Sequence, residues 1–403
     1  MRDVYVAGVG ITPFRKALDS TIAGLAAEAT QEAMTDAGID AERVGMAFFG
    51  NAMGGLMTGQ EMIRAQAGLG ETDLITTGVP MVSVENACAS SSSAVHLAWM
   101  AVASGQVDIA VAVGAEKMTA EDKTKAFHAL ASAVDLQRVP ELEADLYGGA
   151  PESAAGADRS LFMDIYADMA KRYMKDSGAT PEDFARVAVK SHQHGALNPD
   201  AQYRDPITVE QVLESRPVSD PLTLLMCSPI GDGAAAVVLC APEVAESLEP
   251  ESVRVRSSAL VSGVRGPAGN TAVERAADRA YESAGLGPKD LDVVEVHDAA
   301  APAELIIYEE LGLCGPGEAP ALLADGATTL GGRIPVNTSG GLLSKGHPVG
   351  ATGCAQIVEI TQQLRGRAGP RQVENARTGL AENGGGYLGP DPAAAVVTVL
   401  SRD

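Results

Sequence analysis

One helix-to-strand pattern occurs twice in this chain, and the repeat limits the folds that are open to it. Residues 29–39 and 276–286 share alanines at matching positions, and Gly38 corresponds to Gly285 at one constant offset. Each copy has the pattern of an amphipathic helix, a glycine that ends it, a short polar link and an apolar strand. A match of this length without gaps indicates an internal duplication. We therefore expect two similar α/β halves whose sheets and helices are layered together.

The chain has 403 residues, which is too many for one ordinary core, so more than one domain is expected. Residues 120–218 do not fit the repeat, because they mix polar clusters with short predicted helices such as 162–174. We interpret 120–218 as a loop (lid) domain inserted into the first half. The first half then comprises residues 1–119 and 219–248, and the second half comprises residues 249–403.

The charge balance excludes several kinds of partner. The chain carries 30 Lys and Arg against 53 Asp and Glu, a net charge of −23. Such a field repels phosphate backbones and anionic lipid surfaces, so we expect no nucleic-acid or membrane-surface binding. No apolar run reaches the roughly 18–20 residues that span a bilayer. The first residues lack the core of a signal peptide, and a cytoplasmic location is expected.

The cysteines predict neither disulfides nor a metal site. The five cysteines lie far apart, with no C-x-x-C pair and no histidine at metal-ligand spacing. Their odd number fits a reducing compartment. We expect no metal and no tightly bound cofactor.

Cys88 is the strongest candidate for a nucleophile. It follows the apolar run 80–84 and comes directly before a stretch rich in serine and alanine that favours a helix. A cysteine in the first turn of a helix lies beside free backbone N–H groups and the positive end of the helix dipole. Both features stabilise a thiolate, so the sequence predicts a pKa below the ~8.5 of a free thiol. The alternative is a small buried core residue.

Three further segments carry polar groups. A glycine-rich loop at 337–353 contains His347 and lets the backbone approach a ligand closely, although a chain of turns with an exposed histidine is the alternative. The strand at 293–296 ends in His297 and Asp298, which form either a site or a helix-capping Asp beside a hydrogen-bonded His. A second glycine run follows Glu382 and leads into a predicted strand at 393–400.

Together these segments closely resemble the thiolase superfamily, and within it the sterol-carrier-protein-2-like and archaeal-type thiolases. The resemblance covers nearly the whole chain. The motifs, in order, are N-A-C-A-S-S at 86–91, C-S-P-I-G-D-G-A-A-A at 227–236, H-D at 297–298, N-T-S-G-G at 337–341 and G-H-P-V-G-A-T-G at 346–353. The resemblance implies a layered α-β-α-β-α fold, made of two duplicated βαβαβαββ halves with a loop domain inserted in the first.

The resemblance also implies roles for single residues. Cys88 takes the acyl group from an acyl-CoA thioester, and His347 activates Cys88 and then helps to bind a thioester oxygen. His297 stands where many thiolases have an asparagine that completes this oxyanion site. The N–H groups of Cys88 and Gly384 form the second oxyanion hole, which stabilises tetrahedral intermediates.

The chain departs from the thiolase pattern in one respect. Many thiolases have a second cysteine as acid/base in a C-x-G element, where this chain has Glu382, and sterol-carrier-type enzymes have it in H-D-C-F, where this chain has Ala299. We expect Glu382, His297 or His347 to take this role, or Cys354 if its helix face points into the site. The alternative for Glu382 is a surface acid that faces solvent.

The leading hypothesis is an acyl-CoA-dependent acyltransferase of thiolase type, which forms or cleaves a carbon–carbon bond through acyl-Cys88. The substrate class, a CoA thioester, implies a role in lipid metabolism. Two alternatives stay open: a retro-aldol lyase acting on a CoA thioester, and an acyl-CoA-binding subunit that needs a small OB-fold (DUF35-like) partner. The family also implies a homodimer or homotetramer.

Overall fold

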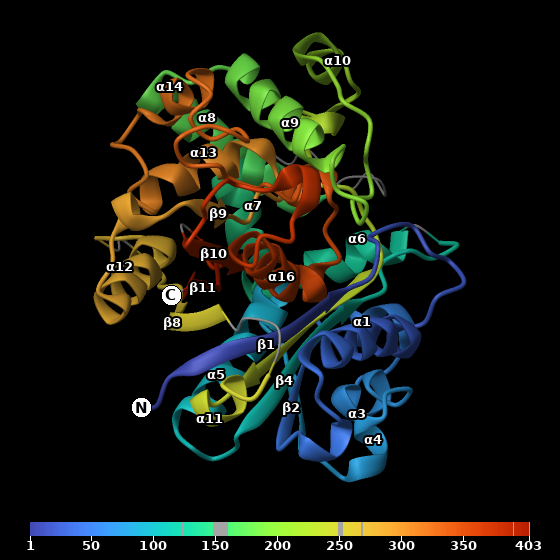
Figure 1. The fold of residues 1–403 in the computed structure, drawn as a ribbon. Helices are drawn as coiled ribbons and strands as arrows, with labels where there is room; N and C mark the ends of the chain where they lie inside the picture. The colour runs from blue at the N-terminus through green and yellow to red at the C-terminus, as the bar shows by residue number, and fades with distance from the viewer. Residues whose placement is uncertain (123, 148–159, 249–252, 267–268, 390, 403) are drawn as a thin grey trace.

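The computed structural model describes the chain except for residues 123, 148–159, 249–252, 267–268, 390 and 403 (Figure 1). Its main feature is a nine-stranded sheet in the order β3-β2-β4-β7-β1-β8-β11-β10-β9. The strands of the first half are β1 (Val4–Ile11), β2 (Met46–Gly50), β3 (Met81–Val84), β4 (Ile109–Glu116) and β7 (Gly233–Cys240). Those of the second half are β8 (Val253–Ser262), β9 (Val293–Glu295), β10 (Thr378–Gly385) and β11 (Ala394–Ser401).

The two halves have the same strand topology, which confirms the duplication predicted from the repeat. In the first half β1 pairs antiparallel with β7, β7 pairs antiparallel with β4, and β4 pairs parallel with β2. In the second half β8, β11, β10 and β9 repeat these pairings in the same order and sense. A parallel bridge between Val294 and Val336 stands where β3 pairs with β2. Antiparallel pairing of β1 with β8 joins the two half-sheets.

Helices α1 (Ile22–Ala37) and α12 (Ala272–Ala284) are the repeated helices, and each covers the outer face of its own half-sheet. Their repeated alanines are buried, because small side chains let a helix lie close to a sheet. Each helix ends at a glycine in the left-handed conformation, Gly38 with φ 62° and Gly285 with φ 66°. The predicted glycine caps are therefore confirmed in both copies.

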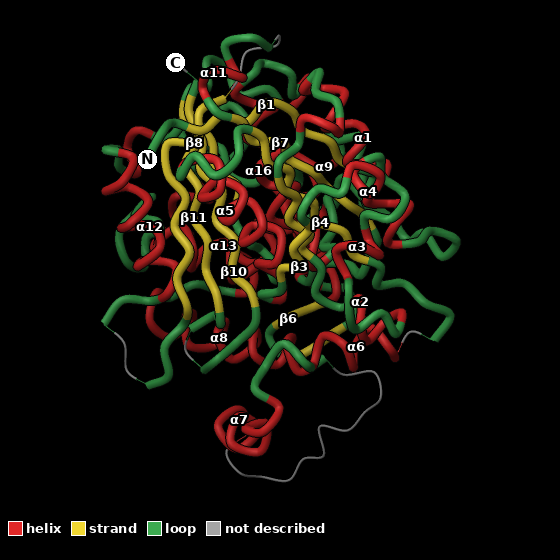
Figure 2. Tube along the Cα trace, turned by 90° about the horizontal axis from the view of Figure 1, so that it is seen from below, coloured by secondary structure: helices red, strands yellow, loops and turns green. Residues whose placement is uncertain are grey.

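Helices α5 (Ser90–Ala103) and α16 (Thr352–Leu364) form the middle layer. Each contacts strands of both halves as well as the other helix, so the two lie between the half-sheets (Figures 1 and 2). They approach closely where Gly353 faces Ser92: a Cβ on Gly353 would lie 2.3 Å from the backbone nitrogen of Ser92. This pair of helices places the start of α5 and the start of α16 side by side.

The remaining helices are grouped by their place in the chain, and the largest group lies in the segment between β4 and β7. Those between β4 and β7 are α6 (Thr124–Ala131), α7 (Val139–Tyr147), α8 (Leu161–Ser177), α9 (Pro181–Gly195) and α10 (Val209–Leu213), with the small hairpin β5 (Pro217–Ser219) and β6 (Leu222–Thr223). The others are α2 (Gly54–Thr58), α3 (Arg64–Gly68), α4 (Leu74–Thr77), α11 (Pro242–Ala245), α13 (Ala301–Glu310), α14 (Ala319–Ala324) and α15 (Gly341–Ser344). Helices α8 and α9 pack against α13, so this region contacts the second half. The domain boundaries stay a prediction, and the boundary at 249 lies outside the described residues.

Among the described residues, no helix combines the length and the apolar character that a membrane span needs.

The contact between α5 and α16 predicts a stability effect. Gly353→Ala places a methyl group against the backbone of Ser92, where neither helix can move without shifting its half-sheet. We expect a loss of about 1–3 kcal/mol in the free energy of unfolding, measured by urea denaturation. Gly269→Ala is the control, because a Cβ there meets no atom within 4 Å. Equal stability of the two variants would contradict this packing.

Candidate active site

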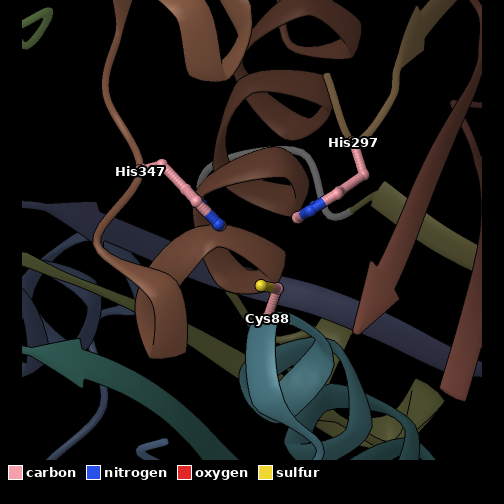
Figure 3. A group of neighbouring side chains, drawn as sticks. All are labelled: Cys88, His297 and His347. Carbon is pink, nitrogen blue, oxygen red and sulfur yellow. The ribbon is translucent and has the colours of Figure 1, made fainter. Parts of the chain in front are cut away.

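Three side chains from separate parts of the chain converge at the start of the middle layer. Cys88 comes from a short 3-10 turn (Ala87–Ala89) before α5, His347 from the glycine-rich loop before α16, and His297 from the segment after β9. The sulfur of Cys88 and one nitrogen of each imidazole lie within 4.8 Å of one another (Figure 3). The structure thus brings together three of the five residues that the sequence singled out, and the other two, Glu382 and Gly384, lie nearby in β10.

Glycine backbones surround the chain just after Cys88 and fix its path. Serines 90–92 are buried, and a Cβ on any of four glycines would lie 2.1–2.7 Å from a backbone or side-chain atom of residues 86–92. These glycines come from three strands and from α16: Gly50, Gly114, Gly353 and Gly385. The serine- and alanine-rich sequence is therefore a packing requirement, because larger side chains would not fit between four backbones.

Cys88 lies before the helix rather than in its first turn, which corrects the sequence-based expectation. Strand β3 ends at Val84 and α5 begins at Ser90, and Ala87 between them has a left-handed backbone with φ 48°. A non-glycine residue with positive φ is uncommon and strained, and here it turns the Cys88 side chain into the cavity.

The Cys88 thiol is neutral in the free protein, contrary to the predicted thiolate. Burial raises the pKa of Cys88 to about 12, although the backbone N–H groups of Gly386 and of Cys88 itself act in the opposite direction. Desolvation of the thiolate therefore outweighs the favourable backbone dipoles. The N–H group beside the sulfur belongs to Gly386, a residue that sequence reasoning missed. The role of Gly384, which lies opposite Ala395 in the sheet, stays a prediction.

Both histidines are neutral as well. Burial lowers the pKa of His297 to about 4, and burial together with the nearby His297 and Lys345 lowers the pKa of His347 well below its usual value. Each ring is held through Nδ1: His297 lies 2.9 Å from the side-chain nitrogen of Asn383, and His347 lies 2.7 Å from Oγ1 of Thr352. A neutral thiol beside a neutral imidazole can still react, provided that the proton moves from sulfur to nitrogen as the thiol attacks.

Glu382 is fully buried, so the alternative of a solvent-facing surface acid is wrong. Its Oε2 accepts a 2.9 Å hydrogen bond from the backbone N–H of His297, while Oε1 has no partner among the described residues. Burial raises the pKa of Glu382 to about 7, and the His297 N–H opposes the shift. Glu382 therefore lies directly behind His297 with a carboxyl group that titrates near neutral pH.

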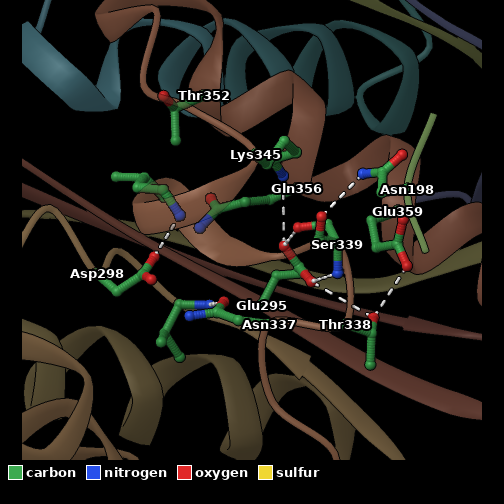
Figure 4. A network of polar contacts seen from close by, with 12 residues as sticks. Asn198, Glu295, Asp298, Asn337, Thr338, Ser339, Lys345, Thr352, Gln356 and Glu359 are labelled. Atoms are coloured by element: carbon green, nitrogen blue, oxygen red, sulfur yellow. Dashed lines mark hydrogen bonds and ion pairs between the residues drawn. The ribbon is translucent and has the colours of Figure 1, made fainter. Parts of the chain in front are cut away.

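The glycine-rich loop is held by buried charges (Figure 4). Glu295 at the end of β9 accepts from the backbone N–H and the hydroxyl of Ser339, and pairs with Lys345 at 3.4 Å. Asp298 accepts the N–H of Leu342 at 2.7 Å. Helix α13 has no side-chain cap, so Asp298 does not cap the helix that follows it; its carboxylate accepts instead from the first turn of α15. These contacts fix the backbone that leads to His347.

Sequence reasoning also missed Glu116, the last residue of β4. Its buried carboxylate accepts from the N–H groups of Ala52 and Met53 in the first half, and from that of Gly350 in the second half at 3.1 Å. Burial raises the pKa of Glu116 to about 7 despite these donors. The run A-V-G-A-E ends an apolar strand in a glutamate, and this was the available sequence signal. Glutamate is rarely buried without partners, so a glutamate at such a strand end points to a structured polar site.

A cavity of about 640 Å³ opens in front of Cys88 and His347. Most of its wall is apolar and comes from the segment between β4 and β7, and two basic residues, Lys16 and Arg216, also line it. The apolar residues include Met53, Met118, Phe127, Leu130, Phe162, Met163, Tyr166, Leu224 and Val349. A cavity of this size and character holds a ligand of drug-like size with an apolar part.

The position of Cys354 decides whether it can replace the missing acid/base cysteine. The sulfur of Cys354 lies 3.7 Å from the carbonyl oxygen of Ala112 in β4, and its side chain belongs to the buried core between the half-sheets. Cys354 therefore faces β4 and is not part of the group around Cys88. This rules it out as the substitute acid/base.

The neutral state of Cys88 predicts slow alkylation of the free protein. The rate of iodoacetamide labelling at Cys88, followed by peptide mass mapping, should rise with pH and show a midpoint above the ~8.5 of a free thiol, because burial raises the pKa to about 12. Denatured protein provides the reference for the same peptide. A midpoint below that of the denatured protein would show instead that the fold stabilises the Cys88 thiolate.

Comparison with known proteins agrees with this site. Residues 4–243 match the family described as "Thiolase, N-terminal domain", and residues 255–402 match "Thiolase C-terminal domain-like". The chain is 40% identical to an acetyl-CoA acetyltransferase of Methanothermobacter thermautotrophicus, over the whole of both chains. It is 36% identical to sterol carrier protein 2 of Gallus gallus, with 99% of this chain and 72% of that protein covered.

Two solved structures have the same fold. The "Ltp2-ChsH2(DUF35) aldolase" superposes with a TM-score of 0.80 at 27% identity, covering 100% of this chain and 98% of that chain. Human mitochondrial 3-ketoacyl-CoA thiolase in complex with CoA superposes with a TM-score of 0.73 at 18% identity, covering 100% and 98%. The family matches cover most of the sequence and the fold agrees throughout, so the chain belongs to the thiolase family.

Proposed function

We propose that this thiolase-type acyltransferase acts on CoA thioesters through an acyl group carried by Cys88. The observation that supports this most directly is the convergence of the Cys88 sulfur with the His297 and His347 nitrogens, two of which groups, Cys88 and His347, line one cavity. A thiol needs a nearby base to attack a thioester, and the developing oxyanion needs a donor. The three side chains supply both.

In the first step the Cys88 sulfur bonds to the carbonyl carbon of the acyl-CoA, and the thiol proton moves to His347. The bond from that carbon to the CoA sulfur then breaks, and the CoA thiolate takes the proton from His347 and leaves as the thiol. The N–H groups near Cys88 stabilise the negative oxygen in between. Because both partners begin neutral, the step separates charge only while substrate is present.

In the second step a base removes a proton from the α-carbon of a second CoA thioester, and the carbanion attacks the acyl carbon. The bond to the Cys88 sulfur breaks, and the thiolate takes up the proton that the base removed from the α-carbon. We propose Glu382 as the base, since its pKa is raised to about 7 and its Oε1 has no partner among the described residues. A carboxylate with this pKa is ionised near neutral pH and is a stronger base than an ordinary glutamate.

The cavity supports a CoA thioester as the substrate. The chain carries a net charge of −23, so anionic CoA phosphates need local cations. Arg216 and Lys16 line the same cavity as Cys88, together with the carboxyl groups of Glu85 and Asp164, and its apolar wall suits a pantetheine arm and an acyl chain. A cytoplasmic location and a role in lipid metabolism remain predictions.

A homodimer is supported by an open sheet edge. Strand β3 ends the nine-stranded sheet, and within the described part of the chain it pairs only with β2. Near it lie three exposed apolar side chains, Leu56 in α2 and Met62 and Ile63 just before α3, with 56, 80 and 66% exposure. Unpaired edges and apolar patches are covered in native proteins, and a two-fold axis through β3 would cover both at once.

A retro-aldol lyase with a small OB-fold partner is the second candidate. The superposition on the Ltp2-ChsH2(DUF35) aldolase supports it, because that protein has the same fold and is an aldolase described together with a DUF35 protein. The lack of a second cysteine at the expected positions points the same way. A retro-aldol reaction needs no acyl-enzyme, so the two candidates differ in what happens at Cys88.

Acylation distinguishes these candidates. Incubation with acetyl-CoA followed by intact mass measurement should show one acetyl adduct, which maps to Cys88 and is absent from Cys88→Ala. Cys314→Ala is the control, since this cysteine lies outside the cavity lining. An unmodified wild-type protein, or an adduct that persists in Cys88→Ala, would overturn the acyltransferase mechanism and favour the lyase or the acyl-CoA-binding subunit.

The base is tested separately with Glu382→Gln. Acylation of Cys88 should proceed, whereas exchange of the α-proton with deuterated solvent and carbon–carbon bond formation should fall by roughly a hundredfold or more. In the wild type the exchange rate should rise as pH increases through about 7, because the base form appears above the raised pKa of Glu382. Exchange at the wild-type rate in the variant would assign the base to His297 or His347.

A further inference from the structure

We propose that Asn383 and Thr352 are positioning residues that hold His297 and His347 in opposite tautomers. Nε2 of His297 then carries a proton, and Nε2 of His347 does not. This inference rests on the proposed function and deepens it, since it explains how two neutral histidines at one sulfur divide the roles of donor and base. Asn383 and Thr352 act through the histidines, so neither needs to touch the substrate.

The tautomer of His297 follows from Asn383. The side-chain nitrogen of Asn383 lies 2.9 Å from Nδ1 of His297. An amide nitrogen only donates, so Nδ1 must accept, and the proton of the neutral ring is then on Nε2. Burial keeps the ring neutral by lowering its pKa to about 4. His297 thereby presents an N–H donor beside the Cys88 sulfur, which is what an oxyanion requires.

Ser92 sets the orientation of the Asn383 amide. Its hydroxyl lies 2.7 Å from Oδ1 of Asn383 and 3.0 Å from the carbonyl oxygen of Ala89, and it has one proton for these two acceptors. Because the amide oxygen faces Ser92 while the amide nitrogen faces His297, the hydroxyl proton goes to Asn383. The competing arrangement reverses the amide, gives the proton to Ala89 and leaves His297 protonated on Nδ1.

Thr352 has the opposite effect on His347. Its Oγ1 lies 2.7 Å from Nδ1 of His347 and 3.2 Å from the carbonyl oxygen of Pro348, one turn earlier. When the hydroxyl donates to Pro348, its oxygen accepts from Nδ1–H, and Nε2 of His347 has a free lone pair. That lone pair is what a base for the Cys88 thiol needs.

The two tautomers also decide whether the site binds metal. Cysteine sulfur and two imidazole nitrogens at this separation are ligands that zinc prefers. A neutral imidazole binds metal only through its unprotonated nitrogen, so Nε2–H of His297 removes one of the three ligands. Asn383 therefore favours catalysis over capture of a soft divalent cation at the same three residues.

The direct test is the tautomer state of the resting protein. Long-range 1H–15N NMR of histidine-labelled protein distinguishes Nδ1–H from Nε2–H, and the chain has only six histidines to assign. We expect Nε2–H for His297 and Nδ1–H for His347. The same tautomer in both rings would overturn the proposal, whether or not the protein transfers acyl groups, because the measurement needs no turnover.

The variant Asn383→Asp should reverse the effect. A carboxylate there accepts from both Ser92 and Nδ1–H of His297, so Nε2 loses its proton. We expect a change in the His297 NMR pattern, a fall of about a hundredfold in carbon–carbon bond formation, and zinc binding measurable by calorimetry. Asn375→Asp adds the same charge at an exposed position and is the control. Unchanged NMR pattern and zinc affinity in Asn383→Asp would contradict the role of Asn383.

Thr352 is tested by a pair of variants. Thr352→Ser keeps the hydroxyl and should retain the wild-type tautomer of His347 and the wild-type pH profile of acylation. Thr352→Val keeps the shape but removes the acceptor for Nδ1–H, so the acylation rate should fall while the CoA KM stays the same. If Thr352→Ser lost the acylation rate and the His347 tautomer as Thr352→Val does, Thr352 would have a packing role only.

Discussion

The site depends on one packing constraint, which is that the chain around Cys88 passes between four glycine backbones. Gly50, Gly114, Gly353 and Gly385 leave no room for side chains beside residues 86–92. The glycines belong to both halves, so the position of the nucleophile is fixed by the joint packing of β2, β4, β10 and α16. Rigid placement of this kind is what preorganised catalysis requires, because a shift of the sulfur by an ångström would separate it from its base.

The duplication explains why the reactive groups come together. The start of α5 in the first half and the start of α16 in the second half occupy equivalent places in their half-sheets, and the two helices pack against each other. Cys88 precedes one helix and His347 precedes the other. The two halves thus contribute different chemistry from equivalent positions, and Glu116 ties them together through its bonds to Met53 and Gly350.

The fold and the central residues could be predicted from the sequence, whereas the protonation states could not. The repeated alanines and glycine caps are local signals, and they correctly indicated two similar halves. The cysteine and histidines stood at strand and helix ends, where such groups gather. Desolvation of Cys88 depends on what surrounds it in three dimensions, so a local dipole argument gave the wrong direction for its pKa. Asn383 and Thr352 gave no signal, because their importance lies in which nitrogen they contact.

The raised pKa of Cys88 has a consequence for the lifetime of the protein. Oxidation of cysteine by peroxides begins with the thiolate, so a thiol with a pKa of about 12 is a poor substrate for that reaction. The same burial that delays ionisation until a thioester arrives therefore protects the idle enzyme from irreversible sulfinic and sulfonic acid formation. Exposure to damage is confined to the moments of turnover, when the thiolate exists.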